Sequence, residues 1–222
     1  MKKSLKILLV IISVAITFSC ASLTYSPSLN LPDKIQKDET KVAAAYELLP
    51  LTNDNEDGDD IVHGMFVSIQ HSYSSRFCMQ AKYWAEINSF KAGKDYNHGA
   101  ALTSYILLND TNAVNKFYLA PTIGMSLIEN KIDMGTIGSW IAMQTQKYSV
   151  FEPYAALGII YGNTNFDRNE WGLGLIPNVG TNISIFNNLM LNIEISFPQL
   201  INSDFEFVRY YFCPTVGFSY GI

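Results

Sequence analysis

Residues 189–197 read Leu-Met-Leu-Asn-Ile-Glu-Ile-Ser-Phe, and this stretch carries the pattern that decides the fold. Every second residue is apolar, namely Leu189, Leu191, Ile193, Ile195 and Phe197. Three of the four residues between them are polar, namely Asn192, Glu194 and Ser196. Successive side chains of a strand point to opposite faces. The stretch therefore predicts a β-strand with one apolar and one mainly polar face.

The same alternation recurs along most of the chain. It predicts ten strands, at about 40–48, 61–73, 77–89, 98–108, 115–127, 133–147, 150–162, 170–186, 188–197 and 206–221. Most are longer than the five or six residues usual in globular proteins, and 9–11 residues suffice for a tilted strand to cross a bilayer. Residues 40–222 are thus predicted to form an all-β domain, a closed antiparallel up-and-down barrel of about ten strands of the outer-membrane type.

The links between these strands indicate an orientation. Short links such as 74–76, 148–149 and 187–188 alternate with longer or more polar ones at 50–60, 90–97, 128–132, 163–169 and 198–205, the six-residue link 109–114 being the exception. Outer-membrane barrels place short turns in the periplasm and longer loops outside. With an even strand count, both ends of the mature chain are expected in the periplasm.

The first twenty residues predict export and a lipid anchor. Three lysines precede an apolar run at 7–18, and Ser19 and Cys20 follow it. This order is typical of a secretory signal, and the run is too short to span a bilayer. We expect residues 1–19 to be a lipoprotein signal peptide, Cys20 to be acylated and residues 20–39 to be a tether. A plain cleaved signal with an incidental Cys20 remains open.

Composition restricts the partners. Without the signal, the chain has 12 Lys and Arg against 20 Asp and Glu, a net charge of −8. Nucleic acid needs a basic surface and is therefore not expected as a partner. Outer-membrane lipid is the expected partner, with a surface ligand that the sequence does not identify. No cofactor is predicted, because no Cys and His cluster has metal-ligand spacing. Cys78 and Cys213 either pair or remain buried thiols.

Five charged residues are predicted to share the barrel interior. Glu47, Glu86, Glu194 and Arg209 are expected in its outer half, with Lys82 deeper. Buried charges need partners, and side chains normally fill a small barrel. The cluster therefore predicts a hydrogen-bonded plug. The alternative is a narrow polar pathway.

Prolines interrupt several of the predicted strands. Three strands share a Pro-x-x-Gly core that begins at Pro121, Pro177 or Pro214, and Pro153 starts a looser relative. Proline cannot donate to a β-ladder. Bulges or local kinks are therefore predicted at these four prolines, unless the strands simply begin there.

From Cys20 onward the chain resembles Bacteroidota outer-membrane β-barrel lipoproteins. The resemblance rests on Cys20, on Tyr25-Ser-Pro27, on Asn30-Leu-Pro32, on the charged stretch Lys37-Asp-Glu39 and on the Pro-x-x-Gly strands. It implies the fold and the location, a lipid-anchored protein of the bacterial outer membrane. It implies no established activity.

The expected function is structural or interactive, through loops at the cell surface. A small-solute channel and a soluble, lipocalin-like tethered binding barrel, whose apolar face would point inward, are the alternatives. An enzyme is not expected. A hydrolase at the rim would need His63 or His98 to act with the nearby residues Asp59, Asp60 or Asp95.

Overall fold

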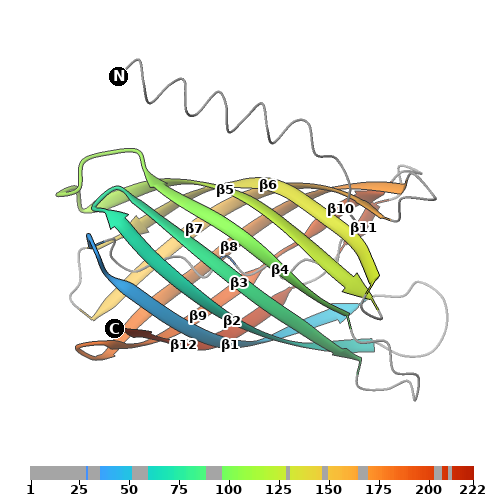
Figure 1. The fold of residues 1–222 in the computed structure, drawn as a ribbon, viewed down its shortest axis with the longest axis horizontal. Helices are drawn as coiled ribbons and strands as arrows, with labels where there is room; N and C mark the ends of the chain where they lie inside the picture. Colours follow the sequence, from blue (N-terminus) through green and yellow to red (C-terminus); the bar gives the residue numbers. More distant parts are fainter. Residues whose placement is uncertain are drawn as a thin grey trace.

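The computed structural model describes residue 29 and residues 36–51, 60–88, 97–128, 131–146, 150–164, 170–202, 207–209 and 212–222. Its strands are β1 (Thr40–Leu51), β2 (Asp60–Ser74), β3 (Phe77–Asn88), β4 (Asn97–Leu107), β5 (Asn115–Ile128), β6 (Lys131–Thr145), β7 (Phe151–Thr164), β8 (Glu170–Phe186), β9 (Leu189–Ser196), β10 (Gln199–Asn202), β11 (Phe207–Arg209) and β12 (Cys213–Gly221). Figure 1 shows them wound into one tilted barrel.

The barrel is closed and antiparallel. Strands β1 to β9 pair in chain order, and β12 pairs with both β9 and β1. The last residue completes the junction, because the Ile222 N–H donates to the Thr40 carbonyl at 2.8 Å. Among the described strands, all but β11 pair with a neighbour on both sides, as a sheet that meets lipid requires.

The twelve strands make ten crossings of the barrel, as predicted. The two shortest strands continue their neighbours: β10 continues β9, and β11 leads into β12. Strand β10 follows β9 after a break at Pro198 and pairs with β8 in the same register. Strand β11 pairs with β10 and precedes β12. The ninth predicted strand therefore reaches Asn202, beyond its predicted end at residue 197.

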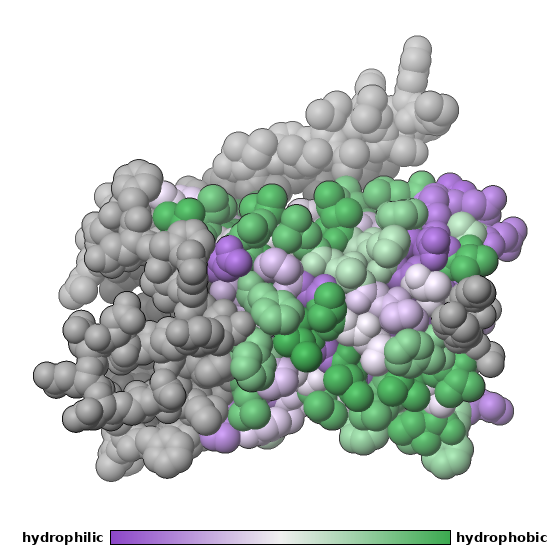
Figure 2. Space-filling model, turned by 180° about the vertical axis from the view of Figure 1, so that it is seen from behind, coloured by the Kyte–Doolittle hydropathy of each residue, from purple (hydrophilic) through white to green (hydrophobic). Residues whose placement is uncertain are grey.

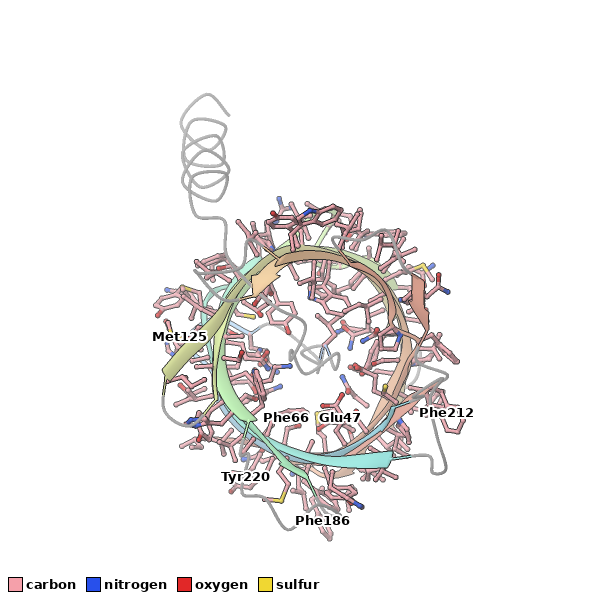
Figure 3. All side chains as sticks on the ribbon, turned by 90° about the vertical axis from the view of Figure 1, so that its right-hand side faces the viewer. Glu47, Phe66, Met125, Phe186, Phe212 and Tyr220 are labelled. Carbon is pink, nitrogen blue, oxygen red and sulfur yellow. The ribbon has the colours of Figure 1, made fainter. Side chains whose placement is uncertain are left out.

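The apolar face points outward and the polar face inward. In the middle of β2, Val67 is 54% exposed, whereas its neighbour Ser68 is 8% exposed. Figure 2 shows apolar side chains gathered over the outer surface. In Figure 3, Glu47 and Phe66 point into the barrel, whereas Met125, Phe186, Phe212 and Tyr220 point away from it. This is the arrangement of a barrel in lipid, and it is the reverse of what a soluble barrel with an apolar interior requires.

The prediction of bulges at four prolines is wrong. The register shifts among the paired strands fall at Ser72/Ser74, Ser126/Leu127 and Ser184/Phe186, close to strand ends. Each proline instead pairs with a residue of one neighbouring strand and has no paired residue on the other. Pro121, for example, pairs with Ser139 of β6, while the β4–β5 ladder passes it without a pair and without a change of register. Because proline has no N–H to donate, the ladder on one side leaves it unpaired, and no residue is inserted as it would be in a bulge.

The links follow the predicted alternation with two differences. The link predicted at 148–149 spans residues 146–150, as many residues as the link 165–169. The link predicted at 128–132 shrinks to residues 129–130, because β5 and β6 extend toward each other. The two longest links, 52–59 and 89–96, join strand ends opposite to the end where β1 begins. No helix in the described part of the chain is long and apolar enough to cross a membrane.

Candidate functional site in the barrel lumen

Glu194 is the centre of the polar interior. It lies in β9 on the inward face and is 2% exposed. Its Oε1 accepts hydrogen bonds from Asn178 Nδ2 at 2.8 Å and from Ser196 Oγ at 3.3 Å, and its Oε2 accepts one from the Tyr154 hydroxyl at 2.6 Å. A buried carboxylate needs such donors to offset its lost hydration. The donors come from β7, β8 and β9, so the network ties three neighbouring strands together.

A glycine makes room for the tyrosine of this network. Tyr154 is paired with Gly180 across the β7–β8 ladder. A Cβ on Gly180 would lie 2.4 Å from the Tyr154 ring, so the ring covers the bare backbone. Cross-strand aromatic residues can protect a glycine in this way. The absence of a side chain at residue 180 thus lets Tyr154 lie flat and point its hydroxyl at Glu194.

The same arrangement occurs twice more on the inward face of the described strands. The Trp140 ring covers Gly158, and the Trp84 ring covers Gly99, with a Cβ expected at 2.5 and 2.4 Å from the respective rings. Both pairs are direct cross-strand partners. The lumen is therefore lined by large rings as well as polar groups, and both fill its volume.

Leu29, which precedes the barrel in sequence, lies inside it. Its side chain belongs to the buried cluster, and the residue is 3% exposed. Its backbone N–H donates to Glu194 Oε1 at 2.8 Å, and its carbonyl accepts from the Tyr105 hydroxyl at 2.8 Å. Tyr105 also lies 3.1 Å from Gln80 Oε1. Both backbone polar groups of Leu29 thus form hydrogen bonds with side chains of the barrel wall.

Lys82 of β3 is a buried cation of the interior and is 3% exposed. Its ammonium lies 4.9 Å from the centroid of the Phe66 ring, a cation–π contact. It interacts electrostatically with Glu47 and Glu194. The positive charge of Lys82 therefore attracts two buried carboxylates. Glu47 and Glu194 lie close to each other along the sheet, because both are cross-strand partners of Thr215.

A second polar group fills the lumen toward the start of β1. Gln144 Nε2 donates to Glu152 Oε2 at 3.1 Å, and the Tyr118 hydroxyl donates to Gln144 Oε1 at 3.3 Å. Gln144 and Tyr118 are fully buried. Hydrogen bonds therefore connect the interior side chains at this level as well.

Three of the five charged residues predicted for the lumen lie there, namely Glu47, Lys82 and Glu194. Glu86 and Arg209 belong to described strands, but their side chains lie outside the described residues, as does Cys20. The sequence did not identify Tyr105, Tyr154 or Asn178 as partners. The alternation of the sequence places these residues on the inward face. Which inward residues contact one another depends on the relative positions of the strands around the barrel.

The two histidines considered for a hydrolase point outward. His63 Nδ1 hydrogen-bonds with the Tyr46 hydroxyl, and His98 Nδ1 lies 2.9 Å from the Tyr83 hydroxyl. Tyr46 and Tyr83 are both exposed on the apolar face. Such Tyr and His pairs suit the aromatic girdle of a membrane interface. Asp59, Asp60 and Asp95, the predicted acidic partners, have side chains outside the described residues.

Cys78 and Cys213 are buried thiols that form no disulfide, each 0% exposed. The expectation of buried thiols is thus met, and the alternative disulfide is not formed. Among the described residues, no group of three or more His, Cys, Asp or Glu is placed to hold a metal ion. The acidic link at 53–59 lies outside the described residues.

Comparison with known proteins identifies the fold. An outer membrane channel from Pseudomonas putida F1 matches with a TM-score of 0.55 at 8% identity, over 88% of this chain and 100% of that chain. The outer membrane protein OprG from Pseudomonas aeruginosa matches with a TM-score of 0.38 at 11% identity, over 85% of this chain and 98% of that chain. The outer membrane protease OmpT from Escherichia coli matches with a TM-score of 0.44 at 10% identity, over 90% of this chain and 99% of that chain. No family model and no curated protein matches the sequence. The chain has the fold of an outer-membrane β-barrel, and a likeness at this level of identity establishes the fold alone.

Proposed function

We propose that this barrel is a lipid-anchored structural or surface-interaction protein whose lumen is plugged by its own side chains and tether. The observation that carries the proposal is the hydrogen-bonded interior around Glu194, which joins three strands and the backbone of Leu29. A pathway for solutes would have to displace these contacts. The exposed parts available for interaction are then the links between strands.

The orientation proposed for the barrel follows from its links. The two longest, 52–59 and 89–96, join strand ends opposite to the end that holds Thr40 and Gly221. Longer loops of outer-membrane barrels face the outside. The start of β1 and the end of β12 are therefore assigned to the periplasm.

The lipid anchor is proposed from the signal sequence and Cys20. Growth with a palmitate analogue should label the native protein and leave a Cys20→Ala variant unlabelled. Membranes that hold this variant should then be washed with high salt and carbonate. We expect it to stay and to need detergent for release, because its outward face is apolar. Release by the wash would contradict the proposed membrane barrel, and equal palmitate labelling of both proteins would contradict the anchor.

The plugged lumen is tested by conductance. Purified native protein in a planar bilayer should produce no steady current steps. The second candidate function is a narrow pathway for small solutes, favoured by the polar inward faces and by the similarity to a solved outer-membrane channel. Steady steps from the native protein would favour this candidate and overturn the plug.

A further inference from the structure

Leu29 connects two opposite walls of the barrel. Its N–H donates to Glu194 Oε1 of β9, and its carbonyl accepts from the Tyr105 hydroxyl of β4, each at 2.8 Å. Four strands separate β4 from β9 on either side of the ring, β5 to β8 on one side and β3, β2, β1 and β12 on the other. The backbone polar groups of one residue therefore bridge the lumen.

The two side chains that receive this residue are held in place by the wall itself. Glu194 accepts from Asn178 Nδ2 at 2.8 Å and from the Tyr154 hydroxyl at 2.6 Å, and the Tyr105 hydroxyl lies 3.1 Å from Gln80 Oε1. Glu194 is 2% exposed and Tyr105 is 0% exposed. Because these contacts come from β3, β7 and β8, they orient the carboxylate and the hydroxyl whatever residue lies between them. Such preorganisation lowers the cost of binding.

An apolar cluster accompanies the two polar groups. Leu29 belongs to a buried cluster that includes Tyr105, Trp140, Ile160 and Ile176. Burying an apolar side chain there is favourable, whereas a charged one would lose its hydration. The site thus has three parts: an acceptor for an N–H, a donor for a carbonyl and an apolar surface for a side chain.

Leu29 occupies this site without belonging to the sheet. It lies in no strand, and no backbone hydrogen bond outside the strands of the described part of the chain involves it. Ten residues separate it from Thr40, where β1 begins. A group joined to its site by a short linker occupies it at an effective concentration in the millimolar range. A separate molecule that offers the same three groups has to compete against that concentration.

We propose that the lumen contains a binding site for an apolar amino-acid residue with an amide on each side, and that Leu29 is a resident ligand which such a molecule replaces. The ligand class is a short apolar peptide or an acylated amino-acid amide. Fatty acids are excluded, because their carboxylate would be repelled by Glu194 and would offer no N–H. The proposal rests on the plugged lumen proposed above and makes the plug exchangeable.

A Leu29→Asp variant of the full chain tests the site. A second carboxylate beside Glu194 and the apolar cluster is strongly unfavourable, so this residue leaves the site. The probe is radiolabelled N-acetyl-leucine methylamide, measured by equilibrium dialysis against purified protein in detergent. We expect the variant to bind the probe about tenfold more tightly than the native protein, because the tethered competitor is removed. Leu29→Met, which keeps an apolar side chain and both backbone groups, is the matched control and should bind as the native protein does.

Two further comparisons establish how the probe is recognised. Adding Tyr105→Phe to Leu29→Asp should weaken binding about fivefold or more, because the carbonyl loses its donor. A probe with an ester oxygen in place of the leucine N–H should bind about tenfold more weakly or worse, because it offers nothing to Glu194. A capped pentapeptide with leucine at its centre is measured beside the small amide. Tighter binding of the pentapeptide would identify a protein segment as the source of the ligand, and tighter binding of the amide a small molecule.

The outcomes separate the site from its premise. Heat-dependent gel mobility shows whether Leu29→Asp is folded, and Leu29→Pro, which removes only the N–H, replaces it if it is not. Equal binding by the folded variant and the native protein overturns the site, as does equal binding of the ester probe, which would indicate apolar partition alone. Planar-bilayer recordings are made on the same native sample. Steady current steps there overturn the plug, whereas a silent native protein and a variant without the expected binding overturn the ligand site alone.

Discussion

Tyr154 in β7 and Glu194 in β9 are joined across the intervening strand β8, because the Tyr154 hydroxyl donates to Glu194 Oε2 at 2.6 Å. The bond passes over the lumen side of Gly180, which is the cross-strand partner of both Tyr154 and Glu194. It links strands that share no ladder with each other. The interior side chains therefore reinforce the barrel independently of the backbone hydrogen bonds.

Removing this bond should destabilise the barrel measurably. Tyr154→Phe keeps the ring over Gly180 but removes a hydrogen bond to a buried carboxylate, a contribution of about 1.5–3 kcal/mol. Urea titration in detergent micelles, followed by gel mobility, measures the change. In a double-mutant cycle with Glu194→Gln, we expect a coupling of about 0.5–3 kcal/mol. Strict additivity of the two substitutions would contradict the interaction.

The glycines under the aromatic rings should resist enlargement. Gly158→Ala would place a Cβ at 2.5 Å from the Trp140 ring, so we expect a loss of about 1–3 kcal/mol in the free energy of unfolding. Gly64→Ala is the matched control, because its Cβ would lie 3.6 Å from the nearest atom, an ordinary contact. Both variants are compared by urea titration. Equal losses at the two positions would contradict the packing explanation.

The outward face should reject charge in proportion to depth. Ile159 is the ninth of fourteen residues of β7, and Phe186 is the last residue of β8; both are exposed. Ile159→Arg should cost about 2–4 kcal/mol in lipid vesicles, whereas Phe186→Arg near the interface should cost about 0–1 kcal/mol. Folding titrations in the same vesicles compare them. If neither substitution has a cost, the outward face does not meet lipid.

Loosening the contact between Tyr105 and Leu29 should open the lumen intermittently. Tyr105→Phe removes the hydroxyl that holds the Leu29 carbonyl, whereas Tyr118→Phe removes a lumenal hydroxyl that donates to Gln144. In planar bilayers we expect brief current steps from the first variant and a silent baseline from the second and from the native protein. Identical traces from both variants would show that this contact does not keep the lumen closed.

The sequence predicted the strands well and the site only in part. Strand alternation is a local pattern, so it predicts directly that Glu47, Lys82 and Glu194 face inward. All three lie in the lumen. The meeting of Tyr154 with Glu194 depends on the relative register of three strands, which no local pattern encodes. Leu29 was harder still, because its backbone makes the contacts and its side chain gives no signal of them.

The junction between β1 and β12 has a consequence for biogenesis. The first strand must find the last one, and their paired residues, such as Val42 and Tyr220, lie at opposite ends of the chain. Contacts so distant in sequence form slowly. Until the final strand is delivered, Thr40–Leu51 presents a bare, apolar hydrogen-bonding edge that invites aggregation. The polypeptide therefore has to be kept from self-association until the barrel closes, and removal of the last ten residues would leave a sheet that cannot seal.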